Sequence, residues 1–351
     1  MAAYLTLAGG RSFRGEYFGA EGEVTGEVVF STGMVGYLET LTDPSYYGQI
    51  LLQTFPLIGN YGVIPPDFES AGVAAAAYIV KHPCQTPSNF RSEGKLSDFL
   101  RERGVVGLCG IDTRALAKTI RSGGVMNGKI TYSPPTPADM AEISAYSVRR
   151  AVAACSVKQL EKHGAPGARR VALMDFGTKR GIIEALATRG CEVWVFPHDT
   201  PAADILRCEP RGVMLGNGPG DPAEDANSGI VAALRELRGA GIPIFGICLG
   251  HQMLALASGY KTGKLPFGHR GTNQPVLDTR TKRVYVTSQN HGYAVLADDC
   301  SFKNINDGTC EGMDYGLSFS VQFHPEARGG PLDTAFLFDS FIERMDAYAA
   351  R

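Results

Sequence analysis

The chain has 351 residues, of which 44% are hydrophobic and 20% are charged, as is ordinary for a globular protein with room for two domains. A formal net charge of −2, with no run of like charges, argues against a nucleic-acid partner. The apolar stretches are far shorter than the roughly 20 residues that a membrane span needs, so no membrane association is expected.

Residues 1–133 are predicted to form a smaller, strand-rich N-terminal domain. Strands are expected at residues 26–32 and 49–54, separated by glycine and proline turns. One helix is expected over residues 115–121, because Asp112 or Thr113 can cap its start and two glycines follow it. Residues 134–168 begin and end with proline and glycine, and this composition is typical of a connector.

From residue 169 the pattern predicts a doubly wound α/β domain that extends to residue 351. Apolar strands alternate with amphipathic helices, which is the pattern of a parallel sheet covered on both faces. Shorter strands are expected after about residue 265. The expected strands are 171–176, 191–196, 212–216 and 243–247, and the expected helices are 179–188, 202–208, 226–238 and one that opens near Leu249.

The eight cysteines show no C-x-x-C pair, so neither a metal site nor a redox pair is predicted. The first residues lack a basic flank followed by a long apolar stretch, and no secretory signal is expected. A disulfide framework is not expected in so large a chain without an export signal, which favours a cytoplasmic location with reduced thiols.

Cys248 differs from the other cysteines in its local context. It lies in Gly246-Ile247-Cys248-Leu249-Gly250, between an expected strand and an expected helix. This is the nucleophile-elbow pattern with Cys in place of Ser, and the helix N-terminus favours a thiolate there. A buried structural cysteine is the alternative interpretation.

A thiolate nucleophile needs a base and a group that orients the base. His324 is the favoured base, because Glu326 lies two residues further on and points the same way in an extended segment. His251 and His291 are competing candidates, and a plain surface turn is the alternative for the His-Pro-Glu sequence.

Backbone N–H groups are the expected donors to an oxyanion. The glycine-rich loop 216–222 follows an expected strand, and the N–H of Leu249 directly follows the nucleophile. Pro219 and Pro222 argue against a phosphate-binding loop, while a simple tight turn stays possible.

The loop 218–222, the elbow 246–252 and the His324-Pro325-Glu326 sequence together resemble the triad-type (class I) glutamine amidotransferases over residues 170–350. The resemblance implies a class I glutamine amidotransferase-like, flavodoxin-like fold. It also implies that Cys248 attacks the carboxamide of glutamine, that His324 transfers the proton, that Glu326 orients His324, and that a glutamyl thioester is hydrolysed.

The first domain extends this resemblance to the carbamoyl phosphate synthetase small-subunit family. The segments 30–37, 41–46, 56–62 and 110–114 are similar to that family, as are residues 175–180 and 288–293. The family implies a heterodimer, or a higher assembly, with a large subunit that holds ATP and Mg and receives ammonia for carbamoyl phosphate. No cofactor is expected in this chain, and arginine and pyrimidine synthesis are the implied pathways.

The same resemblance implies which residues contact glutamine: Ser45, Gly218, Gly220, Leu249, Gln252, Asn290, Gly292 and Tyr293. Tyr293 stands where the family often has Phe.

Two other hypotheses remain open at this point. A stand-alone hydrolase such as a γ-glutamyl peptidase would need no partner, and a regulatory subunit would need no triad.

Overall fold

The computed structural model describes residues 1–167 and 169–350, and the chain divides into two compact units, Met1–Arg149 and Arg150–Arg351. The division falls inside the segment predicted as a connector. Ala168, the last residue of that predicted connector, and Arg351, the predicted end of the second domain, lie outside the described residues. No helix in the described ranges is long and apolar enough to cross a membrane.

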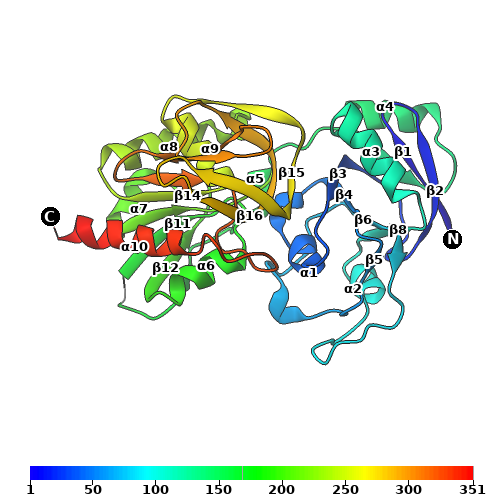
Figure 1. Ribbon diagram of the computed structural model, residues 1–351, viewed down its shortest axis with the longest axis horizontal. Coiled ribbons are helices and arrows are strands. Elements are labelled where there is room, and N and C mark those ends of the chain that lie inside the picture. Colours follow the sequence, from blue (N-terminus) through cyan, green and yellow to red (C-terminus); the bar gives the residue numbers. More distant parts are fainter. Residues whose placement is uncertain (168, 351) are drawn as a thin grey trace. The chain divides into compact units, whose positions relative to one another are not determined.

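The N-terminal unit is built on a closed barrel in the strand order β1-β2-β8-β6-β4-β3-β9, drawn in blue to cyan-green in Figure 1. The strands from β3 through β4 and β6 to β8 are parallel neighbours, and the others pair antiparallel. The barrel strands are Ala2–Leu7 (β1), Ser12–Tyr17 (β2), Val24–Ser31 (β3), Gln49–Gln53 (β4), Ala77–Val80 (β6), Val106–Cys109 (β8) and Met126–Thr131 (β9). The predicted strand-rich character of this unit is therefore confirmed.

Successive residues of a barrel strand point to opposite faces, and two separate cores result. Ile50 and Leu52 pack with Leu116 of α3, whereas Leu51 packs with Leu38 of α1. Asp112 caps α3, and its carboxylate accepts a hydrogen bond from the N–H of Ala115 at 2.9 Å. The remaining elements are Tyr37–Leu41 (α1), Pro44–Tyr46 and Pro65–Asp67 (3₁₀ turns), Leu57–Ile58 (β5), His82–Pro83 (β7), Leu96–Glu102 (α2), Thr113–Gly123 (α3) and Pro137–Ala145 (α4).

The C-terminal unit is a ten-stranded sheet in the order β10-β12-β11-β13-β14-β19-β18-β16-β15-β17. Its middle is the predicted parallel sheet, because β12, β11, β13, β14 and β19 are parallel neighbours. The strands are Glu161–His163 (β10), Arg169–Met174 (β11), Cys191–Phe196 (β12), Gly212–Leu215 (β13), Ile244–Ile247 (β14), Lys261–Asp278 (β15), Val284–Leu296 (β16), Phe302–Asn304 (β17), Cys310–Asp314 (β18) and Phe319–Val321 (β19).

Helices cover both faces of this sheet, as the alternating pattern predicts (Figure 1). Val171 and Leu173 of β11 pack with residues of α6 and α10, whereas Ala172 and Met174 pack with residues of α7, α8 and α9. The helical elements are Ala151–Cys155 (α5), Arg180–Ala187 (α6), Ala202–Arg207 (α7), the 3₁₀ turn Asp225–Asn227, Ser228–Gly239 (α8), Leu249–Ala257 (α9) and Phe336–Ala349 (α10).

Two expectations about this unit are wrong. The expected short strands after residue 265 are found only in β17, β18 and β19, because β15 has 18 residues and β16 has 13. Register shifts interrupt the pairing of β15 with β16, and such bulges let a long ribbon bend while it stays paired. The strand before His324 ends at Val321, so His324 and Glu326 lie in a turn rather than in the expected extended segment.

Candidate active site

The carboxyl ends of four parallel strands, β11, β13, β14 and β19, bring the candidate site residues together. Cys248 follows β14, His324 and Glu326 follow β19, and the loop 216–222 follows β13. This edge of an open α/β sheet is where ligands bind, because the loops and helix N-termini converge there.

Cys248 occupies a strained elbow. Its backbone has φ 55° and ψ −104°, which places a non-glycine residue in the left-handed half of backbone space. Its N–H donates to the carbonyl of Val321 at 2.9 Å, so the end of β19 helps to fix the turn. The thiol is 2% exposed and lies 3.6 Å from the carbonyl oxygen of Asn290.

The two glycines of the elbow are required by close packing, as the sequence pattern indicates. A Cβ on Gly246 would lie 2.7 Å from the carbonyl oxygen of Gly250, and a Cβ on Gly250 would lie 2.4 Å from that of Leu215. Contacts this short force the backbone to shift, so side chains at either position would displace α9 from the sheet.

Gly250→Ala should therefore lower the stability of the chain by about 1–3 kcal/mol, because the new methyl group overpacks the junction between β13 and α9. Urea unfolding followed by circular dichroism measures this change. Gly229→Ala in α8 is the matched control, since nothing lies within 4 Å of the added carbon and helix propensity favours Ala. Equal midpoints for the two variants would contradict the packing argument.

His324 and Glu326 form a buried, hydrogen-bonded pair. The His324 Nδ1 to Glu326 Oε1 distance is 2.7 Å, and the side chains are 2% and 0% exposed. The contact arises within a turn rather than along a strand. Burial and Lys179 oppose protonation of His324, but Glu326 and Cys248 outweigh them and raise the pKa of its imidazole.

Lys179 completes this group and was missed from the sequence as a site residue. Its Nζ lies 2.8 Å from Glu326 Oε1 and 3.4 Å from His324 Nδ1. Burial acts to raise the pKa of Glu326, but Lys179 and His324 together hold it well below its usual range, so the carboxylate stays ionised. The only signal in the sequence was the position of Lys179 in the segment 175–180.

The competing histidines have other partners. His251 is buried, its Nδ1 lies 2.8 Å from the hydroxyl of Ser320, and burial lowers its pKa to about 3. Nδ1 of His291 lies 2.8 Å from the carbonyl oxygen of Tyr293. Of the three histidines, only His324 has both Glu326 and the Cys248 thiol beside it.

The glycine-rich loop 216–222 packs against the elbow. A Cβ on Gly218 would lie 2.3 Å from the carbonyl oxygen of Phe176 and 2.9 Å from the Leu249 side chain, so only glycine fits there. Gly220 has φ 93°, which also favours glycine. The Asn217 side chain accepts the N–H of Lys179 at 2.9 Å, which joins this loop to the start of α6.

The predicted glutamine contacts are divided between the two units. Asn290, Gly292 and Tyr293 lie on β16, and the Gln252 amide on α9 donates to the carbonyl of Tyr293 at 2.7 Å. Ser45 lies in the N-terminal unit, in a 3₁₀ turn capped by the Asp43 carboxylate, so its part in glutamine binding stays a prediction.

One group of side chains in the described residues has the spacing of a metal site: His269, His291 and Glu311, with ligand atoms within 4.8 Å of one another. Every ring nitrogen of the two histidines already has an oxygen within 2.8–3.3 Å. An ion would have to displace these partners. The group is therefore a hydrogen-bonded network in this structure.

The C-terminal half matches the family described as glutamine amidotransferase class-I over residues 172–344, which is the class of protein that this fold and site define. The N-terminal half matches the family described as carbamoyl-phosphate synthase small chain, CPSase domain, over residues 5–130. The chain belongs to the carbamoyl-phosphate synthase small chain family.

Curated relatives match almost end to end. The carbamoyl phosphate synthase small chain of Fusobacterium nucleatum is 46% identical over 97% of this chain and 98% of its own length. The small chain of Clostridium perfringens is 47% identical over 98% and 99%. The pyrimidine-specific small chain of Halalkalibacterium halodurans is 44% identical over 99% and 98%. These matches include the N-terminal half of the chain. A stand-alone peptidase would not need this half, so the matches argue against that alternative.

Proposed function

We propose that Cys248, His324 and Glu326 are the catalytic triad with which this small chain hydrolyses glutamine. One observation carries the proposal: a buried thiol on a strained elbow lies beside an imidazole whose other nitrogen is 2.7 Å from a buried carboxylate. Nucleophile, base and orienting group are the parts that acyl transfer through a thioester requires.

In the first half-reaction the Cys248 thiolate attacks the carboxamide carbon of glutamine. The imidazolium of His324 donates its proton to the departing nitrogen, ammonia leaves, and a glutamyl thioester remains on Sγ. The raised pKa of His324 supports this assignment, since the ring carries the proton that the leaving group needs.

In the second half-reaction His324 accepts a proton from water, which attacks the thioester and releases glutamate and the thiolate. Glu326 stays ionised beside Lys179 and holds the His324 ring at Nδ1, which leaves Nε2 for the proton transfer. Lys179 is accordingly a positioning residue, because it acts through Glu326.

The oxyanion is assigned to the N–H groups of Leu249, which directly follows the nucleophile, and of Gly218, whose loop packs against the Leu249 side chain. The other predicted contacts would bind the rest of the substrate. They are Gly220, Gln252, Asn290, Gly292, Tyr293 and, from the N-terminal unit, Ser45.

The ammonia is used by a large subunit, which binds ATP and Mg and makes carbamoyl phosphate from bicarbonate. The carbamoyl phosphate serves arginine and pyrimidine synthesis. This assignment is supported by membership of the small chain family. The proposal places the two subunits in a heterodimer, or a multiple of it, in the cytoplasm, and gives the small chain no cofactor of its own.

The isolated chain should make no carbamoyl phosphate from glutamine, ATP and bicarbonate, because its sequence has no ATP-grasp or P-loop segment. Synthesis should appear when the large subunit is added. Co-purification of the two chains, followed by glutaminase and synthesis assays with and without the large one, measures both effects. Synthesis by the single chain would refute this division of labour.

A further inference from the structure

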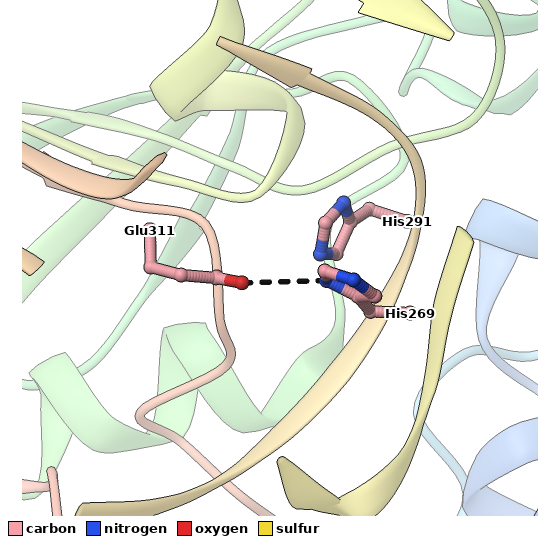
Figure 2. A group of neighbouring side chains, drawn as sticks. All are labelled: His269, His291 and Glu311. Carbon is pink, nitrogen blue, oxygen red and sulfur yellow. Dashed lines mark ion pairs between the residues drawn. The ribbon is translucent and has the colours of Figure 1, made fainter. Parts of the chain in front are cut away.

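A buried polar network lies between the long strands β15 and β16 and the strand β18, next to the predicted glutamine contacts. It contains His269 on β15, His291 on β16 and Glu311 on β18 (Figure 2). The His269 and His291 rings meet edge to face, with centroids 4.9 Å apart. The triad chemistry described above uses none of these three side chains.

His269 is held between two carboxylates. Its Nε2 lies 2.8 Å from Asp307 Oδ2, and its Nδ1 lies 3.3 Å from Glu311 Oε1. Burial opposes a charge on this ring, but Glu311 and Asp307 outweigh burial and raise the pKa of His269. The two carboxyl groups therefore favour the imidazolium form of His269, in which both ring nitrogens donate.

Glu311 holds the network in place from strand β18. The carboxylate is fully buried, and its Oε1 accepts a hydrogen bond from the Asn304 amide at 3.0 Å. Burial raises the pKa of Glu311, whereas His269 and Asn304 act to lower it, and a buried acid that loses such partners is costly, so His269 and Glu311 hold each other in place.

His291 connects the His269–Glu311 pair to the backbone of β16, the strand that carries three of the predicted glutamine contacts. Burial and the neighbouring charge of His269 hold its pKa well below the usual range, so the ring is neutral. Its Nδ1–H then donates to the carbonyl oxygen of Tyr293 at 2.8 Å. The same carbonyl accepts the Gln252 amide at 2.7 Å, and Gln252 also donates to Gln322 at 2.9 Å.

We propose that Glu311 and His269 are positioning residues for glutamine binding, and that they act through His291 on the backbone of Asn290, Gly292 and Tyr293. The inference rests on the proposed function, because it takes these three residues of β16 as substrate contacts. The triad lies at the ends of β14 and β19 and contacts β16 at the Asn290 carbonyl, so the network acts more on the affinity for glutamine than on the chemical step.

Glu311→Ala and His269→Ala should each raise KM for glutamine about tenfold or more in the complex with the large subunit, since each removes a buried, charge-assisted hydrogen bond. The kcat should change less than about threefold. Glu311→Gln should recover most of the affinity, because the amide keeps an acceptor for His269 and Asn304. Carbamoyl phosphate synthesis from added ammonia should equal that of the unaltered complex.

Glu192→Ala is the matched control, a buried acid of the same unit on the distant strand β12, and it should leave KM unchanged. An unchanged KM in Glu311→Ala, or an equal rise in Glu192→Ala, would overturn the proposal. So would a KM of the unaltered complex that responds to a chelator or to added Zn²⁺, which would make the group a metal centre. Loss of the proposed function would show separately, as glutaminase activity that survives Cys248→Ser.

Discussion

Replacing Cys248 by Ser should abolish carbamoyl phosphate synthesis from glutamine in the complex while synthesis from added ammonia continues. The hydroxyl is far less acidic than the thiol, and the elbow geometry and His324 are suited to a thiolate. We expect the glutaminase kcat to fall by at least about a thousandfold. Parallel assays of the purified complex with glutamine and with ammonium measure both activities.

Cys208→Ser is the matched control for this prediction. Cys208 follows α7, is half-buried, and has its thiol 3.6 Å from the carbonyl oxygen of Asp204 rather than near the triad. The control should keep both activities. If Cys248→Ser loses the glutamine-dependent and the ammonia-dependent activity to the same extent, Cys248 has a structural role and the proposed chemistry fails.

His324→Ala should lower the glutaminase kcat by about 10²–10⁴-fold, the usual contribution of a positioned acid-base group. His251→Ala should keep much more of the rate, although it also lies close to Cys248 in sequence. The structure gives the reason, because His251 faces Ser320 and is kept neutral by burial, whereas His324 lies beside Glu326 and the thiol.

The two histidine variants are compared by steady-state glutaminase kinetics in the complex, with ammonia-dependent synthesis as the test of intact assembly. His251 is fully buried, so its replacement by Ala leaves a cavity and should lower the stability of the chain. The opposite order of rates, with His251→Ala slower than His324→Ala, would reassign the base.

The sequence by itself determined the features that depend on neighbours along the chain. Gly246 and Gly250 identify the elbow by pattern, and the constraint on Gly246 is local because its Cβ would meet the Gly250 carbonyl, whereas the constraint on Gly250 comes from Leu215 of β13. Glu326 could be assigned to His324 because it lies two residues further on, although a turn rather than a strand brings them together. The parallel middle of the sheet also followed from local hydrophobic patterns.

Only the tertiary structure decided which distant groups meet. It shows that His324, rather than His251 or His291, lies beside Glu326. It also shows that Lys179 contacts Glu326 and that Glu311 contacts His269. It also shows that β15 and β16 are long strands, whose pairing continues across bulges that no local sequence pattern predicts. The physical reason is that strand order and register fix such contacts, and both are set by packing of the whole sheet rather than by neighbouring residues.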